Sequence, residues 1–407
     1  MHSNLYDYRF FANDEDHTRV RRSIAHAFSD KALVEQEPLI QRYMGLLVEK
    51  LRDAVSVSDN GSSPDMVRMY NYTTFDIMAD LTFGEPLGLL ERTDYVPWVA
   101  GIIASAKFFG IFGPLRAAFP LLMPLIQRTL LRSMQKKRAT HGRFAREHVD
   151  ARLARETTRP DIWTFVLRNS ANDPGKGGLS REEMYAQASS LMGAGTETTA
   201  SLLSGLTWLL CVNPDKLDRL NVEVRQAFGS GEDVGMQALA RLPYLNACIQ
   251  EGLRIIGVAA GYTTGRSRYL RTTSGREGKL SQSVAMQVAD ISQTVVYVSH
   301  FAAYRNDANF HDPDSFCPER WLPDADPRFA NDNHSVFEPF SFGPRNCVGK
   351  NLAWHEARAI LANIVLNFDM QSSERTDKNW IDQKAYVLWV KKPLYLHLKP
   401  RSPDVKE

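Results

Sequence analysis

The stretch that decides the fold is a cysteine-containing loop, Phe340-Ser-Phe-Gly343-Pro-Arg345-Asn-Cys347-Val-Gly349. It leads directly into residues 350–368, whose apolar periodicity predicts a helix. A thiol at this position lies close to the positive end of the helix dipole and to unpaired backbone N–H groups. Both favour the thiolate, which is the form that binds a metal. The stretch therefore predicts that Cys347 binds a metal; the alternative is a buried cysteine in a glycine-rich turn.

The residues around this cysteine are suited to a flat, acidic ligand. Gly343 and Gly349 carry no Cβ, so the backbone can approach such a ligand closely. Arg345 supplies a permanent cation that suits a carboxylate. Together with Phe340 and Cys347, these residues resemble the haem-binding loop of the cytochrome P-450 family of haem-thiolate monooxygenases.

The composition is that of an ordinary globular protein. The chain has 407 residues, of which 43% are hydrophobic and 24% are charged, and its net charge of +2 gives no argument for nucleic-acid binding. Its cysteines are scattered and form no CxxC pair, which indicates a reducing compartment and one working thiol: Cys211, Cys248, Cys317 and Cys347. His355 and Glu356 do not form a zinc-protease motif, because position 359 is alanine.

Hydrophobic periodicity predicts a mostly α-helical fold (α+β) in a single domain over residues 1–407. Ser180 and Glu183 form a capping box that opens a long helix, which ends before Asn213. Other helices are expected at residues 16–28, 37–54, 67–83, 132–155, 216–228, 244–256 and 350–368. Strand-like alternation is found at residues 294–299 and 386–398. The resemblance implies a cytochrome P-450 fold with small peripheral β-sheets.

The long helix carries the sequence Ala194-Gly195-Thr196-Glu197-Thr198-Thr199. A hydrogen bond from Thr198 to the carbonyl of Ala194 would loosen this turn and open a groove, and Glu197 beside that hydroxyl could relay protons. The alternative is a threonine-rich helix face. In the family that the chain resembles, this stretch is the oxygen-binding kink, with Gly195 beside the haem and the acid–threonine pair as the catalytic proton relay.

Three charged residues lie in two separate motifs. Glu251 and Arg254 are three residues apart on one helix face and can pair. Arg320 lies downstream in a proline-bounded turn. The resemblance implies that these residues form a structural triad that braces the haem loop, since a buried ion network fixes geometry more than it adds stability.

An arginine near the start of the chain also matches the family pattern. Arg21 occupies the place of an arginine that reaches a haem propionate, while His17 stands where tryptophan is more usual. The resemblance implies that Arg21 and Arg345 anchor the propionates, with His17 nearby. The alternative is that residues 17–21 are surface charges on a helix.

The resemblance implies haem b held through the Cys347 thiolate, O2 as oxidant and electrons from NADPH through a cytochrome reductase. Lys350 and Arg358 are candidate reductase contacts. The expected substrate is an apolar small molecule, because the apolar residues 96–125 would form the roof of the pocket. Phrases at residues 71–76 and 309–316 are similar to fungal secondary-metabolism hydroxylases of the isotrichodermin C-15 hydroxylase type. The alternatives are an inactive chain and a haem binder without turnover.

The chain departs from the family in two places. It begins at what resembles the third helix, so we expect a truncated domain without the membrane anchor, first helices and early strands. Full-length relatives lie on the endoplasmic reticulum membrane, so that membrane surface and the cytoplasm are the alternative locations. Residues 257–293 look aberrant, being basic and proline-free where the family has a proline-rich stretch. A reading-frame slip and an authentic basic loop are the alternatives.

Overall fold

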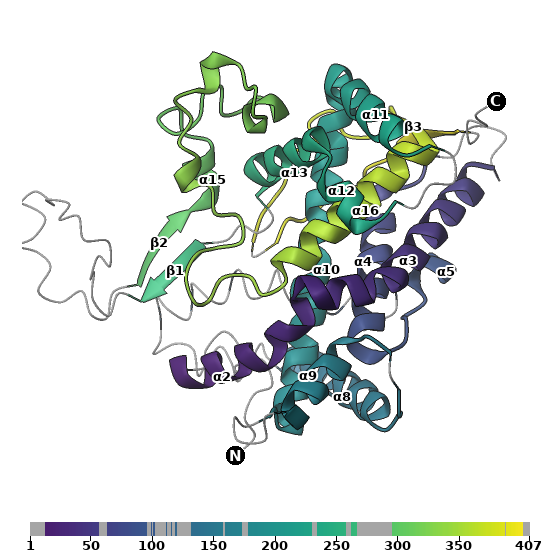
Figure 1. Cartoon of the computed structure of the whole chain (residues 1–407), viewed down its shortest axis with the longest axis vertical. Coiled ribbons are helices and arrows are strands. Elements are labelled where there is room, and N and C mark those ends of the chain that lie inside the picture. Colours follow the sequence, from purple (N-terminus) through teal and green to yellow (C-terminus); the bar gives the residue numbers. More distant parts are fainter. Residues whose placement is uncertain are drawn as a thin grey trace, which may run out of the picture.

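The computed structural model describes residues 13–56, 63–95, 132–157, 159–172, 178–229, 234–257, 262–266, 295–386 and 388–401, and positions 99, 101, 111, 115 and 119. Helices dominate this part of the chain, which confirms the predicted fold class (Figure 1). The helices are α2 (Asp14–Ala25), α3 (Asp30–Ser56), α4 (Met66–Phe83), α5 (Leu89–Arg92), α8 (Arg132–Leu153), α9 (Ile162–Asn172), α10 (Arg181–Val212), α11 (Pro214–Ala227), α12 (Met236–Ala240), α13 (Pro243–Ile256), α15 (His300–Tyr304) and α16 (Lys350–Asn367). Short 3-10 turns are η1 (His26–Phe28), η4 (Pro318–Trp321), η5 (Pro327–Phe329) and η6 (His334–Val336).

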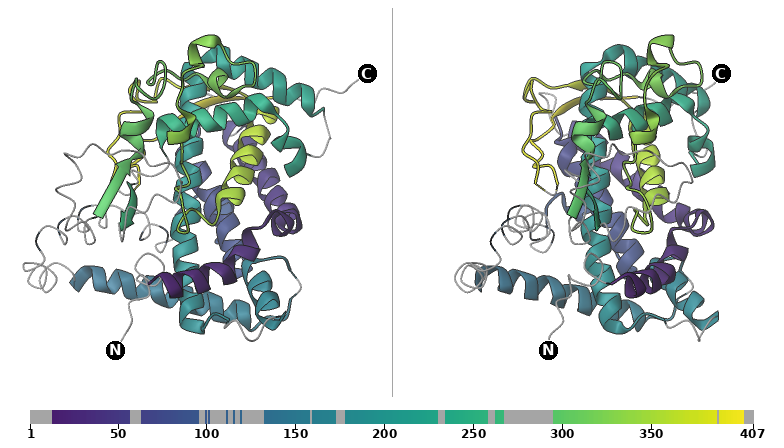
Figure 2. Two further views of the ribbon diagram at one scale, coloured as in Figure 1. Left: turned by 60° about the vertical axis from the view of Figure 1, so that its left-hand side comes forward. Right: turned by 90° about the vertical axis from the view of Figure 1, so that its left-hand side faces the viewer.

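The 32-residue helix α10 runs through the middle of the molecule, with other helices on several sides (Figure 2). The predicted capping box is present: the Ser180 side chain accepts from the backbone N–H of Glu183, and the Glu183 carboxylate accepts from the N–H of Ser180. Because α10 is apolar on most sides, its burial by neighbouring helices is expected. It ends where Pro214 opens α11.

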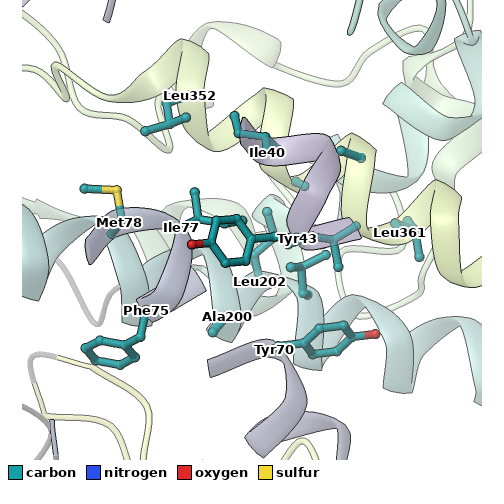
Figure 3. Packing of buried hydrophobic residues seen from close by; sticks show 14 of the residues in the cluster. Ile40, Tyr43, Tyr70, Phe75, Ile77, Met78, Ala200, Leu202, Leu352 and Leu361 are labelled. Carbon is teal, nitrogen blue, oxygen red and sulfur yellow. The ribbon is translucent and has the colours of Figure 1, made fainter. Parts of the chain in front are cut away.

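Side chains from α3, α4, α10 and α16 share one apolar core (Figure 3). The buried residues labelled there are Ile40, Tyr43, Tyr70, Phe75, Ile77, Met78, Ala200, Leu202, Leu352 and Leu361. The hydroxyl of Tyr70 is buried and satisfied by the hydroxyl of Thr207, at 2.6 Å. This core holds the first turns of α16, which follow the Cys347 loop, at a fixed place relative to α10.

One predicted helix was too short. The helix expected over residues 37–54 begins at Asp30, so Pro38 lies inside α3. Proline removes one backbone donor within the helix. However, Leu33 and Gln36 on the preceding turns are buried, and Gln36 Nε2 donates to the Ala27 carbonyl at 3.2 Å. Burial of these turns outweighs the missing hydrogen bond, so the helix continues through the proline.

The strands form two small antiparallel sheets. The expected strand at residues 294–299 is β2 (Val295–Ser299), paired with β1 (Tyr262–Arg266). The strand expected at 386–398 is wrong over most of its length, because β4 (Leu396–Pro400) begins only near its end and pairs with β3 (Phe368–Ser372). Two side-chain contacts hold the residues before β4 out of a regular strand. Trp389 Nε1 donates to the Gly257 carbonyl at 2.6 Å, and the side chain of Lys391 is buried against Glu197.

Several sequence expectations fall mainly outside the described residues. They include most of the apolar residues 96–125, expected to form the roof of the pocket, and most of the aberrant segment 257–293, apart from β1 and residue 257. A single truncated domain over residues 1–407 likewise stays a prediction. Within the described part of the chain, no helix combines the length and the apolar character that crossing a membrane requires.

Two glycines at helix interiors provide a test of the core. A Cβ at Gly205 of α10 would lie 2.5 Å from Cδ1 of Ile256, whereas a Cβ at Gly45 of α3 would meet nothing within 4 Å. We expect Gly205→Ala to lower the free energy of unfolding by about 1–3 kcal/mol through overpacking. Gly45→Ala should raise it by about 0.5–1 kcal/mol through helix propensity. Urea unfolding of both variants measures this, and equal effects would contradict the packing.

Candidate active site

The Cys347 loop is a tight turn that ends at the start of α16. The N–H of Cys347 donates to the carbonyl of Phe340 at 2.8 Å, and the N–H of Asn346 donates to that of Gly343 at 3.1 Å. Gly343 has a φ of 82°, which favours glycine. Cys347 is exposed and lies two residues before Gly349, the N-cap of α16. The turn therefore presents the thiol at a helix N-terminus, as the sequence predicted.

The other three cysteines lie in different surroundings. Burial raises the pKa of the Cys211 thiol to about 12. Burial also raises the pKa of Cys317, and it raises that of Cys248 well above its ordinary value. These groups are held in the thiol form, which is a poor metal ligand. Of the four cysteines, Cys347 is the exposed one, and it is therefore the best placed to ligate a metal.

Helix α2 is tied to the Cys347 loop by two arginines. Arg21 donates to the backbone carbonyl of Asn346 at 2.5 Å and also to its side-chain oxygen. Arg345 reaches back to Asp14 at 2.8 Å. His17 lies half-buried one turn before Arg21. The two cations expected near the propionates are thus close to the loop, although sequence reasoning did not identify Asn346 as the partner that holds Arg21.

Helix α10 is mostly buried but is exposed to solvent at Ala194. Ala194 is exposed, while Thr196 and Glu197 are buried. The predicted hydrogen bond is present, with Thr198 Oγ1 donating to the Ala194 carbonyl at 2.6 Å. Gly195 contacts α4, which the sequence did not predict. A Cβ at this position would lie 2.9 Å from Sδ of Met78. This glycine allows α4 to approach α10, and its contact with a cofactor stays a prediction.

Glu197 is bound to a residue that sequence reasoning missed. Its Oε2 accepts from Nζ of Lys391 at 2.5 Å, and both side chains are almost completely buried. Thr198 donates to the backbone instead of to Glu197. In sequence, Lys391 and Lys392 look like a pair of surface lysines, so no signal in the sequence identifies Lys391. Only the chain reversal before β4 brings it to α10.

Helix α16 touches α10 one residue beyond the proposed relay. Glu356 is buried against Thr199, and burial raises the pKa of Glu356 to about 8. Glu356 lies six residues after Lys350, which corresponds to about 9 Å along the helix. This contact therefore brings the start of α16, and with it the Cys347 loop, towards the opening at Ala194.

The predicted charge triad is assembled in the buried region beside α13. Glu251 accepts from Arg254 at 2.8 and 2.9 Å and from Arg320 at 3.2 Å, and the side chains of all three are fully buried. Two further groups complete it: Trp321 donates to Glu251 at 2.8 Å, and Asp332 pairs with Arg320. Trp321 is adjacent to Arg320 in the sequence, but nothing there points to Asp332.

This network extends to the Cys347 loop through α15. Arg254 donates to the Tyr304 carbonyl at 2.8 Å, and the Tyr304 hydroxyl accepts from the N–H of Glu338 at 2.8 Å. Glu338 lies two residues before Phe340, where the loop begins. A path of hydrogen bonds thus connects the buried charges to the loop that carries the thiol.

The residues present fit a haem held by a cysteine thiolate. An exposed thiolate-forming residue at a helix N-terminus is the donor that a soft or borderline iron site needs. The space beyond Gly343 is open, and Ala194 is exposed in the middle of a buried helix. Arg21 and Arg345 add positive charge at the loop. The site can thus bind a flat anionic macrocycle through its metal and its carboxylates.

Known proteins of similar sequence point to one family. A sequence profile described as Cytochrome P450 matches residues 4–398. The cytochrome P450 monooxygenase efuB of Hormonema carpetanum is 43% identical over 393 residues, 96% of this chain and 74% of that protein. The cytochrome P450 monooxygenase FUM2 of Gibberella moniliformis is 44% identical over 385 residues, covering 94% and 77%. Averantin hydroxylase of Dothistroma septosporum is 37% identical over 396 residues, covering 96% and 71%.

Removing the charge at the centre of the buried network should be strongly destabilising. Glu251→Gln leaves Arg254 buried without its counter-charge and leaves Arg320 with Asp332 alone, so the free energy of unfolding should fall by about 3–5 kcal/mol. Chemical denaturation measures the change. The matched control is Glu374→Gln, which breaks the exposed pair with His397 and should have little effect. Similar effects of the two variants would contradict a central role for Glu251.

Glu356 should make stability depend on pH in a defined direction. Its pKa is about 8 in the folded protein and ordinarily about 4.5, so between these values the folded state keeps a proton that the unfolded state releases. Stability from this group therefore falls as pH rises through this window. Glu356→Gln removes this pH dependence. As pH rises, the free energy of unfolding of the variant should therefore increase relative to that of the wild type by up to about 1.4 kcal/mol per pH unit.

Urea unfolding of both proteins at about pH 6 and about pH 8 measures this difference. Burial lowers the pKa of the neighbouring His355 to about 4, but His355 is present in both proteins and its contribution cancels. Parallel pH curves would show that Glu356 does not titrate in this way.

Proposed function

The chain belongs to the cytochrome P450 family of haem-dependent monooxygenases, and on that premise we propose that Cys347 is the thiolate ligand of its haem iron. The observation that carries the proposal is the exposed thiol at the start of α16, compared with three cysteines whose pKa is raised by burial. A thiolate-ligated haem supplies the activation of O2 for insertion of one oxygen atom into a substrate.

The residues around Cys347 would bind and orient this group. Phe340, Gly343 and Gly349 shape the loop, and Arg21 and Arg345 place cations where the haem carboxylates would lie. The triad of Glu251 with its two arginines holds this side of the site in place. Thr198 and Glu197 are proposed to hold and pass the protons that oxygen activation consumes.

We propose that the substrate is an apolar small molecule of secondary metabolism, which this chain hydroxylates. A cavity of about 250 Å³ supports this, because its walls include Ile255, Ile256, Phe301, Trp380 and Trp389. Polar side chains also line the cavity, namely Ser201, Arg305, Asp382, Gln383 and Lys391, so the apolar and aromatic part of the wall would contact such a ligand. The similarity to a relative named as a hydroxylase, averantin hydroxylase, points in the same direction.

Electrons are proposed to come from NADPH through a cytochrome reductase, at a membrane surface. Lys350 is exposed beside the Cys347 loop, with its Nζ 5.8 Å from the centre of the Phe340 ring. Arg358 is less suited to the contact, because it is half-buried and donates to Asn246 at 2.7 Å. We therefore favour Lys350 as a contact on the reductase-binding face.

The carbon monoxide difference spectrum of the reduced protein, expressed with haem supplied, tests the assignment. We expect a thiolate-type Soret band that is lost in Cys347→Ala, because no other ligand in the loop supplies sulfur. Cys211→Ala is the matched control and should keep the band, since burial holds that thiol protonated. A band that survives Cys347→Ala would overturn the assignment.

Two alternatives give different results in the same preparation. An inactive chain would take up no haem and show no band. A haem binder without turnover would show the band but no substrate-dependent consumption of NADPH. The proposed monooxygenase shows both signals, so the experiment separates the three.

A further inference from the structure

The pairing of Glu197 with Lys391 is unusual because both groups lie deep inside the protein. The side chain of Glu197 is 3% exposed and that of Lys391 is 5% exposed. Lys391 lies in the irregular segment before β4, 194 residues after Glu197 in the sequence. A buried pair of this kind seldom adds net stability, since taking two charges out of water costs about as much as their attraction returns. Its presence beside the proposed proton relay therefore points to a role other than stability.

The surroundings of Lys391 satisfy the ammonium group completely. Nζ donates to Glu197 Oε2 at 2.5 Å, to the Ser201 hydroxyl at 3.1 Å and to Asn71 Oδ1 at 3.3 Å. An ammonium has three N–H donors, and each has an acceptor here. Asn71 is held in turn, because its Nδ2 donates to the Tyr95 hydroxyl at 2.9 Å. Lys391 is thus fixed by α4 and α10 together, as an ordered part of the site.

The same arrangement separates the acid from the alcohol. Thr198 donates to the Ala194 carbonyl, while Glu197 faces Lys391. The second carboxylate oxygen, Oε1 of Glu197, is buried and has no hydrogen-bond partner within the described part of the chain. One oxygen is therefore held by the lysine, and the other remains available to accept a proton.

We propose that Lys391 is a positioning residue for Glu197: it holds the acid turned towards the irregular segment before β4 and away from Thr198. This inference rests on the proposed role of Glu197 in proton transfer. Lys391 and Ser201 both line the cavity, together with Trp380 and Trp389 of the same C-terminal segment. The wall that contacts the substrate therefore also carries the cation that sets the orientation of the acid.

Three variants test the proposal. Lys391→Met removes the charge and keeps much of the volume, Lys391→Arg keeps the charge, and Lys392→Met is the matched control. Lys392 is the next residue, but it pairs with Asp377 at the surface, at 2.7 Å. Each change is also made in the Glu197→Gln background, so that any effect exerted through the acid can be isolated.

The first readout is the melting temperature, which needs no turnover. Lys391→Met should lower it by on the order of 5 °C, because Glu197 is left buried without its cation. The loss should be much smaller in the Glu197→Gln background and small for Lys392→Met. Equal losses in both backgrounds would show that the two side chains are not coupled, and this would overturn the proposal whether or not the chain takes up haem.

The second readout separates positioning from a purely structural role. With a reductase supplied, the fraction of NADPH electrons lost as hydrogen peroxide should rise about tenfold in Lys391→Met, as expected when proton transfer is impaired. Lys391→Arg should restore most of the coupling, and Lys391→Met should add nothing in the Glu197→Gln background. Unchanged peroxide loss, with a lowered melting temperature, would mean that the pair is structural and the proposal is wrong. Absence of the Soret band would instead count against the proposed function.

Discussion

The rest of the site depends on the burial of the Glu251 carboxylate. A buried charge of this kind must be neutralised and fully hydrogen-bonded, because water is not available to it. Arg254 and Arg320 satisfy it, and Arg254 also bonds the Tyr304 carbonyl. The Tyr304 hydroxyl then fixes the backbone at Glu338, just before the Cys347 loop. One electrostatic requirement in α13 thus determines where the thiol loop can begin.

A second constraint comes from the polar residues of α10, which lie inside an apolar helix. Several of them have partners from different parts of the chain: Glu197 pairs with Lys391, Thr199 lies against Glu356, and Thr198 donates to its own backbone. These contacts bring α16 and the C-terminal segment against the same stretch of α10. The proposed relay residue Glu197 and the cavity are therefore neighbours, because Lys391 pairs with Glu197 and also lines the cavity.

Sequence reasoning succeeded where the signal is local. The capping box at Ser180 and the Thr198 bond to the Ala194 carbonyl depend on residues three or four positions apart, and both are present. It failed where distant contacts decide the outcome. Pro38 did not end or begin a helix, because the turns before it are buried. The alternation at residues 386–398 did not produce one strand, because Lys391 is drawn into the core.

The sequence by itself determined the family and the expected chemistry, because the spacing of residues around Cys347 and within α10 encodes local turns and caps. The charge triad was also predictable in its members, although not in the part that Asp332 plays. Only the tertiary structure decided that Arg21 binds Asn346 and that Glu197 faces Lys391. Such pairs join residues that are far apart in the chain, and their partners are selected by burial and hydrogen-bond geometry, which no local pattern of residues records.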